Sequence, residues 1–350
     1  MAKLFSARGA RSLLACAIAS SLFCVLSGTL TAQQPWSVQD RWKIGGDGGW
    51  DDLRVDSATH RLFLSRGARF DVVDTQTGKL IGSIQNLHHT HSIAFDPNSK
   101  LGFLTDGTGA NVVVVIDRAT LATVAKIPAG ENPDLILYEP FTKTIWAFNG
   151  RSHDATVIDI ASLKAVATVP LPGKPEFSAA DGKGTIFVNI EDKNALVRLD
   201  AVRRTITANW PLKGCESPSG LGFDAEGGRL FSVCDGKKMA ITDAASGNSL
   251  GTASIGIGPD GAAYSEKSHQ AFSSNGEGTL SVVDAAAPGY PTIQTLATEK
   301  SARTMAFDPE SNRIYVVAAE FGPRPAATPE NPKPAAPLVP GSFVVLVIGQ

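Results

Sequence analysis

The chain has 350 residues, of which 43% are hydrophobic and 19% are charged, so it can bury a core and is not intrinsically disordered. Its formal net charge of −2 argues against a dedicated nucleic-acid-binding protein, which would need a basic face. The 34 glycines and 21 prolines are typical of a fold with many tight turns.

The N-terminus has the order of a secretory signal peptide. Three basic residues precede an apolar, uncharged stretch, residues 12–30, and a small residue follows at Ala32. We therefore predict that residues 1–32 are removed, that the protein is periplasmic or secreted, and that no membrane span remains. The alternatives are an uncleaved anchor and a lipid attached at Cys16 or Cys24. Scattered small and polar residues argue against the anchor.

Residues 33–350 are predicted to form one domain built on a repeated pattern. An aromatic residue in a short apolar run recurs seven times, at spacings of 40 to 44 residues. An aspartate that ends a Val/Ile-rich run recurs in register with it. The aromatic markers are Phe63, Phe103, Trp146, Phe187, Phe231, Phe272 and Tyr315; the aspartates are Asp74, Asp117, Asp159, Asp200, Asp243 and Asp284. A fixed period of this length indicates a repeat architecture.

Each unit contains four short runs of β-branched and aromatic residues, separated by turn-forming Gly, Pro, Asn and Asp. In the second unit these runs cover residues 91–95, 101–105, 112–116 and 123–127. Four antiparallel strands in about 42 residues are typical of a propeller blade, so the pattern predicts an all-β, seven-bladed β-propeller. We expect each aspartate marker to accept backbone N–H groups in the turn that follows it.

The last unit has room for three strands only, at residues 304–307, 313–317 and 343–348. An additional run at residues 37–44 precedes the first unit. We predict that this run becomes the outer strand of the last blade and closes the ring, which leaves no open sheet edge.

The segment VVVVIDRATLATVAKIPAG, residues 112–130, and the recurring FDP openings resemble the YVTN/YncE family of bacterial β-propeller repeat proteins, within the WD40-like superfamily. The likeness covers residues 37–350. It implies an exported or periplasmic propeller, but few members of the family have an assigned role. Related seven-bladed lactonases share the fold, which is an analogy only.

The first strand of every blade starts near the central channel, so one residue from each blade is expected at the same channel mouth. Counting back four residues from the apolar residue before each first turn gives seven positions, at spacings of 40 to 43 residues. We call these positions the channel ring: Asp51, His91, Asp134, Glu176, Ser219, Asp260 and Arg303. Clustered carboxylates with a histidine are suited to a divalent cation or a cationic ligand.

Two functions fit the channel ring. In the first, a monomeric, non-catalytic protein binds a small ligand, a cation or a protein partner at this face. In the second, the protein is a lactonase-like or other hydrolase, with or without a metal, in which His91 and Glu176 act as acid and base and Arg303 holds an anion. A third alternative is structural, because polar residues line any water-filled channel. No GxSxG, P-loop, HExxH or EF-hand motif supports a specific enzyme class.

His89 and His91 alternate along a strand and so lie on one side of it. With Asp51 and Asp134 from neighbouring blades they are candidate ligands of a divalent cation, although two histidines in a polar loop can also be merely exposed.

Cys215 and Cys234 fall on the same face of the fifth blade. In an oxidising compartment they predict a disulfide that closes a loop of about 20 residues, with two free thiols as the alternative.

A proline-rich insertion, residues 320–342, separates the second and third strands of the last unit. Its seven prolines should keep it out of the sheet, extended or mobile, on the face that carries the channel ring. It shades the channel, meets a partner, or is a tolerated surface insertion.

Overall fold

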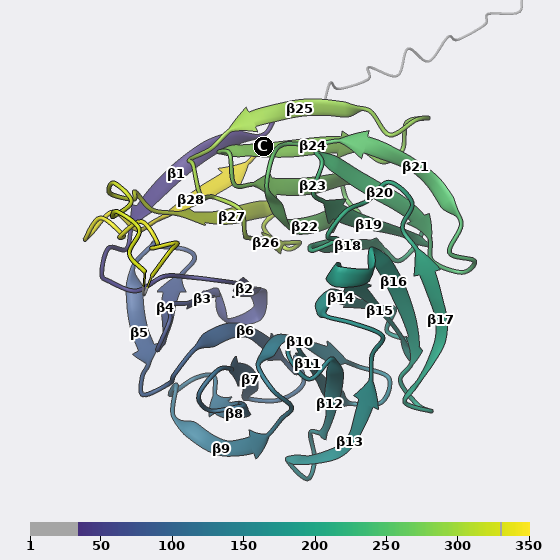
Figure 1. The fold of residues 1–350 in the computed structure, drawn as a ribbon, viewed down its shortest axis with the longest axis horizontal. Coiled ribbons are helices and arrows are strands. Elements are labelled where there is room, and N and C mark those ends of the chain that lie inside the picture. Colours follow the sequence, from purple (N-terminus) through teal and green to yellow (C-terminus); the bar gives the residue numbers. More distant parts are fainter. Residues whose placement is uncertain (1–33, 330) are drawn as a thin grey trace, which may run out of the picture. The chain divides into compact units, whose positions relative to one another are not determined.

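The computed structural model describes residues 34–329 and 331–350. Its Pro35–Gln350 unit consists of seven four-stranded antiparallel sheets, arranged as blades around a central channel (Figure 1). The predicted all-β, seven-bladed propeller is therefore confirmed. The predicted signal peptide lies outside the described residues. Among the residues that are described, no helix has the length and hydropathy that crossing a membrane requires.

Blades 1 to 6 are each built from four consecutive strands, paired in sequence order. Blade 1 contains β2 (Leu53–Asp56), β3 (Arg61–Ser65), β4 (Phe70–Asp74) and β5 (Leu80–Ile84). Blade 2 contains β6 (Thr90–Phe95), β7 (Leu101–Asp106), β8 (Val112–Asp117) and β9 (Thr123–Pro128). Blade 3 contains β10 (Pro133–Glu139), β11 (Thr144–Asn149), β12 (Asp154–Asp159) and β13 (Lys164–Pro170).

Blades 4 to 6 repeat this arrangement. Blade 4 contains β14 (Pro175–Ala180), β15 (Thr185–Ile190), β16 (Ala195–Asp200) and β17 (Thr205–Pro211). Blade 5 contains β18 (Leu221–Asp224), β19 (Arg229–Cys234), β20 (Lys238–Asp243) and β21 (Ser249–Ser254). Blade 6 contains β22 (Pro259–Ser265), β23 (Gln270–Asn275), β24 (Thr279–Asp284) and β25 (Thr292–Ala297). Two single-turn 3₁₀ helices, η1 (Ser57–Thr59) and η2 (Glu191–Lys193), lie in connections.

Blade 7 joins the two ends of the described chain. Its order is β1-β28-β27-β26, where β1 is Ser37–Lys43, β26 is Met305–Asp308, β27 is Arg313–Ala318 and β28 is Val344–Gly349. Figure 1 shows β1 in purple alongside β28 in yellow. The antiparallel register runs from Ser37 opposite Gly349 to Lys43 opposite Val344, with one irregularity. The predicted closure by the segment before the first repeat is confirmed.

The hydrophobic core lies between neighbouring blades. Between blades 1 and 2, Phe63 and Phe70 pack with Ile93 and Leu104, all of them buried. All seven aromatic markers are at most 2% exposed. The aromatic residue thus recurs because each blade has to fill the same space against its neighbour at the density of a protein interior.

The aspartate markers close the turns between the third and fourth strands. Oδ1 of Asp74 accepts hydrogen bonds from the backbone N–H groups of Thr77, at 2.7 Å, and Gln76, at 3.0 Å. Equivalent contacts are made by Asp117, Asp159, Asp200, Asp243 and Asp284. The predicted turn role of these residues is confirmed.

Trp36 fastens the N-terminal segment to blade 6. Its indole is 2% exposed, contacts the ring of Phe272 edge-on at 4.9 Å and donates from Nε1 to Oε1 of Gln270 at 2.8 Å. Its backbone N–H donates to the side chain of Gln294, which donates back to the Trp36 carbonyl. The closing strand is therefore anchored on the sheet beside the one it completes.

We expect Trp36→Ala to lower the free energy of unfolding by about 3–5 kcal/mol, because it leaves a large cavity and removes a buried hydrogen bond. The measurement is chemical denaturation followed by intrinsic fluorescence or circular dichroism. Val38→Ala is the matched control, since Val38 lies in the same segment but is 37% exposed. Equal losses for the two variants would contradict the anchoring role of Trp36.

Candidate functional site

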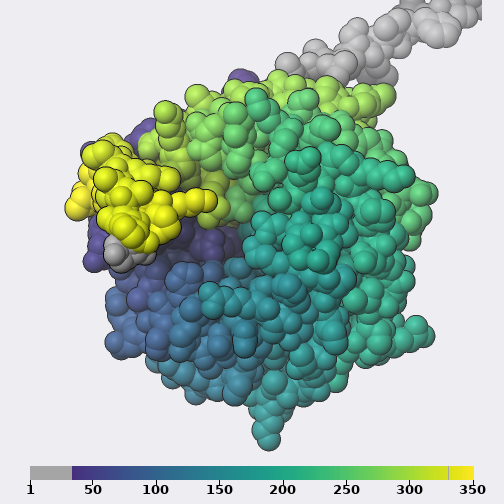
Figure 2. Space-filling view, in the orientation of Figure 1, coloured from purple at the N-terminus to yellow at the C-terminus, as the bar shows by residue number. Residues whose placement is uncertain are grey.

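All seven residues of the channel ring line one pocket of about 250 Å³. Its other lining residues are Asp52, Ser92, Leu135, Lys174, Phe177 and Glu191. Lys174 precedes β14 and Glu191 follows β15, so this mouth receives loops from fourth to first strands and from second to third strands. Figure 2 shows the face hollowed near its centre, with the proline-rich insertion in yellow beside the hollow.

Interruptions of the strand register aim several ring side chains into the pocket. His91, Asp134, Glu176 and Asp260 each lie where the pairing between the first and second strands of their blade shifts. A bulge leaves a residue out of the ladder and redirects its side chain. The other three ring residues, Asp51, Ser219 and Arg303, lie in the connections just before first strands.

Polar side chains of the second strands brace the ring from the preceding blade. The hydroxyl of Thr105 in β7 donates to the carbonyl of Asp134 at 2.8 Å, and Asn189 in β15 donates from Nδ2 to the carbonyl of Ser219 at 2.9 Å. Ser65 and Ser274 make the same kind of contact, to the carbonyls of Thr90 and Arg303. Sequence reasoning missed these four residues, although each lies two positions after an aromatic marker.

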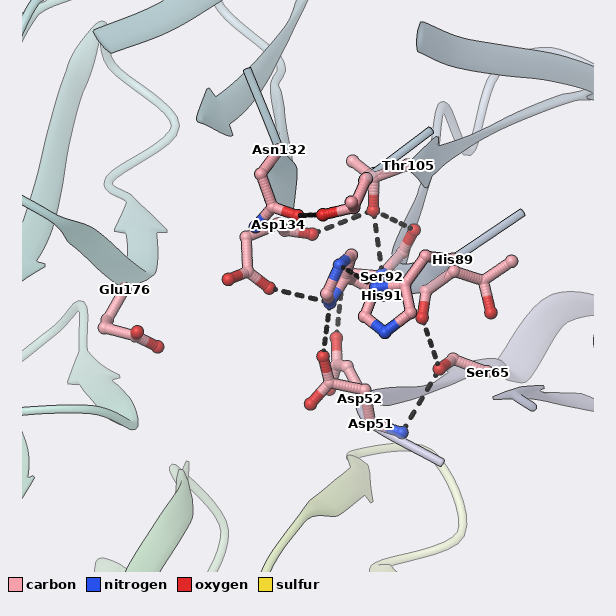
Figure 3. A network of polar contacts seen from close by, with 12 residues as sticks. Asp51, Asp52, Ser65, His89, His91, Ser92, Thr105, Asn132, Asp134 and Glu176 are labelled. Carbon is pink, nitrogen blue, oxygen red and sulfur yellow. Dashed lines mark hydrogen bonds and ion pairs between the residues drawn. The ribbon is translucent and has the colours of Figure 1, made fainter. Parts of the chain in front are cut away.

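His91 joins three consecutive blades. Its Nδ1 lies 2.6 Å from Oδ2 of Asp51 and 3.1 Å from Oδ1 of Asp134, and the residue is 7% exposed (Figure 3). Burial alone would lower the pKa of the imidazole, but the hydrogen bonds to Asp134 and Asp51 raise the pKa of His91 to about 10. Asp51, His91 and Asp134 could together hold a metal ion, because their ligand atoms lie within 4.8 Å of one another.

His89 lies outside this trio. Its Nδ1 contacts Nε2 of His91 at 2.8 Å, and the two rings meet edge-on. The pairing on one side of the strand that alternation predicts is therefore present, but His89 faces the far side of the His91 ring and would support a ligand residue instead of coordinating.

Glu176 lies across the pocket and has different partners. Figure 3 shows no contact between it and His91, and its carboxylate pairs with Nζ of Lys174 at 2.7 Å. Lys174 also pairs with Glu191. Burial and the charge of Asp134 raise the pKa of Glu176 to about 8, against the opposing effect of Lys174. The acid–base pair of Glu176 and His91 considered from the sequence is thus two separate groups that share a pocket.

Arg303 is engaged by carboxylates. Its guanidinium lies 3.3 Å from Asp260 and 4.0 Å from Asp51, and its side chain is 52% exposed. Oδ1 of Asp260 in turn accepts from the hydroxyl of Ser219 at 3.1 Å. Burial raises the pKa of Asp260 to about 6, although the charge of Arg303 acts in the opposite direction. Arg303 therefore already pairs with carboxylates of the ring, and the anion-holding role predicted from its charge stays a prediction.

Two further sequence features lie close to this face. Cys215 and Cys234 form a disulfide across 19 positions, and both residues are buried. The described residues of the proline-rich insertion lie outside the blade sheets and include one isolated bridge of their own, Phe321 with Leu338. Phe321 also contacts Trp50, with 5.8 Å between ring centroids.

Comparison with known proteins shows the fold and no more. No family model and no curated protein matches the chain. Among solved structures it is similar to the hydrazine synthase of Kuenenia stuttgartiensis, with a TM-score of 0.69 and 14% identity over 78% of this chain and 94% of that one. Because 1778 solved chains match the fold, the likeness does not single out an activity.

The raised pKa of Glu176 generates a prediction about stability. The charged groups facing its carboxylate are Asp134 on β10 and Lys174 and Glu191 on the flanking loops. Between the unfolded pKa of about 4.5 and the folded pKa of about 8, the native state holds a proton that the unfolded state has lost. The free energy of unfolding should therefore fall as the pH rises through this window.

We expect Glu176→Gln to flatten the fall in stability between pH 6 and pH 8, because the neutral amide has no proton to lose. Urea denaturation at the two pH values measures the difference. The exposed Glu226→Gln variant supplies the matched control and should keep the wild-type slope. If the free energy of unfolding of Glu176→Gln fell with pH as steeply as that of the wild type, the carboxyl of Glu176 would not be the titrating group.

Proposed function

We propose that this protein is a binding protein whose channel-ring pocket holds a small, positively charged ligand. The observation that carries this proposal is the convergence of six carboxylates from four blades on one pocket: Asp51, Asp52, Asp134, Glu176, Glu191 and Asp260. The three basic residues beside them, His91, Lys174 and Arg303, each already pair with carboxylates.

Electrostatics supports a cation as the ligand. Burial of carboxylates with too little compensating positive charge raises the pKa of Glu176 to about 8 and of Asp260 to about 6. A bound cation would supply the missing charge and stabilise both ionised groups. The pocket volume of about 250 Å³ is below the range of drug-sized sites, which favours a small ligand such as an amine.

A hydrolase is the second candidate, and Glu176 is the observation that favours it. A carboxyl whose pKa is raised to about 8 suits general acid–base catalysis near neutral pH. In this alternative His91 is a separate acid and Arg303 contacts the substrate. Binding is preferred because these groups are engaged by other side chains and no nucleophile is poised between them among the described residues.

One set of variants separates the two candidates. Isothermal titration with small amines, for instance putrescine, choline and arginine, should show saturable binding that Asp260→Asn weakens by about 10- to 100-fold, the effect of losing a charge-assisted contact. In parallel, hydrolysis of lactone and ester substrates is assayed for the wild type and Glu176→Gln.

A binding protein gives no turnover that depends on Glu176, whereas a hydrolase loses activity by at least about 100-fold in Glu176→Gln. Glu226→Gln is the control in both assays. Absence of binding for every cation, or equal binding by wild type and Asp260→Asn, would contradict the proposed ligand class.

We propose further that the protein is exported and that it belongs with the YVTN/YncE-like propellers. The repeat segment at residues 112–130 supports the family, and the N-terminal sequence and the Cys215–Cys234 disulfide support an oxidising compartment. Expression from the full sequence, followed by fractionation and N-terminal sequencing, should yield a periplasmic or secreted protein that begins at residue 33. Retention of the first 32 residues in the cytoplasm would contradict export.

A further inference from the structure

The trio Asp51, His91 and Asp134 brings three lone-pair-bearing atoms from three blades to one point. Oδ2 of Asp51 and Oδ1 of Asp134 lie 2.6 and 3.1 Å from Nδ1 of His91. Figure 3 shows these side chains directed toward one another from three blades. Ionised carboxylates can only accept hydrogen bonds, so the space between the three atoms has to hold a positive particle, either a proton on Nδ1 or a metal ion.

The far nitrogen of His91 is arranged as in metal-ligating histidines. Nε2 contacts Nδ1 of His89 at 2.8 Å. A metal-binding histidine donates its other ring N–H to a neighbouring acceptor, which fixes the tautomer and the ring orientation. In the tautomer that carries its hydrogen on Nε2, His91 donates to Nδ1 of His89, and the lone pair of its own Nδ1 faces the two carboxylates. Gly107 leaves room for this ring, because a Cβ there would lie 2.8 Å from Nε2.

A separate observation beside the trio also points to a cation. Asp52 lines the same pocket and is 5% exposed, yet its Oδ1 has no hydrogen-bond partner among the described residues. Its other oxygen is held by Ser92 and Arg54. Arg54 already supplies one positive charge to this carboxylate, but Oδ1 still lacks a donor, and a cation bound in the pocket would offset the cost of burying that oxygen.

The two distances from Nδ1 of His91 need only a small adjustment to hold a metal, and the ligand atoms of all three residues lie within 4.8 Å of one another. Around a tetrahedral ion with bonds of about 2.0 Å, neighbouring donors lie about 3.3 Å apart. The two contacts of Nδ1 are 2.6 and 3.1 Å, so they would open by less than about 1 Å. The backbones on either side are braced, at Asp51 by the hydroxyl of Ser65 and at Asp134 by that of Thr105.

We propose that Asp51, His91 and Asp134 form a site for a divalent transition-metal ion, with Zn²⁺ or Mn²⁺ preferred over Mg²⁺ and Ca²⁺. One imidazole nitrogen with two carboxylate oxygens favours first-row transition ions, whereas Mg²⁺ and Ca²⁺ prefer oxygen ligands alone. Three protein ligands leave further coordination positions open to the pocket. The proposal uses the pocket of the proposed function but does not depend on its organic ligand.

The test is isothermal titration of the full-length exported protein, first treated with a chelator and dialysed, with ZnCl₂, MnCl₂ and MgCl₂. We expect one equivalent of Zn²⁺ or Mn²⁺ to bind at least 10-fold more tightly than Mg²⁺. Asp134→Asn, which keeps the shape of the ligand, should weaken binding by at least 10-fold. Glu226→Gln, which removes an exposed carboxylate outside the pocket, should leave it within about 3-fold of the wild type.

Co²⁺ substitution of the wild type gives a measurement that does not depend on any variant's folding. Visible absorption bands should show coordination by one nitrogen together with oxygens at one equivalent. No saturable binding of Zn²⁺ or Mn²⁺, or equal binding by Asp134→Asn and the wild type, would overturn the site. If amines bind while these metals do not, the metal site is contradicted and the proposed function stands. If the metals bind while amines do not, the metal site stands and the proposed ligand class is contradicted.

Discussion

The antiparallel ladder between β1 and β28 is the interaction on which the rest of the structure depends. It pairs the segment before the first repeat with the last strand of the chain, so the seven blades form a closed ring without a free edge between them. Closure also completes the pocket, because Asp51 belongs to the first blade and Arg303 to the last. Their 4.0 Å ion pair spans the boundary between blades 1 and 7, which lie side by side because this ladder closes the ring.

The fold could be predicted from the sequence because its determinants are local and repeat. Blade 2 has the same core aromatic, Phe103, and the same turn aspartates, Asp96 and Asp117, as the equivalent positions of other blades. Each repeat alone is a weak indication of a blade, but seven repeats in register are a strong one. The same periodicity placed the channel ring. Residues such as His91 and Asp134 lie 43 positions apart in the chain, and radial symmetry alone brings them to one mouth.

The partners of these side chains could not be predicted in the same way. Lys174 and Glu191 enter the pocket from loops, whose conformations follow from tertiary packing and not from the repeat. The register shifts that redirect His91 and Glu176 have no marker of their own in the sequence. The charge of Arg303 likewise does not show which carboxylates it meets, and in the structure these are Asp260 and Asp51.

The uneven distribution of polarity along the first strands argues that the acidic mouth exists for a ligand. Farther along these strands, a second pocket is lined largely by small or apolar residues, among them Ala262, Ala263, Met305 and Phe307. The fold therefore accommodates apolar side chains close to its axis. Replacing buried charged groups by apolar ones is often neutral or stabilising, so stability alone gives no reason to keep six carboxylates at one end. Their clustering there, beside backbones braced from neighbouring blades by residues such as Thr105 and Asn189, supports the proposed binding site.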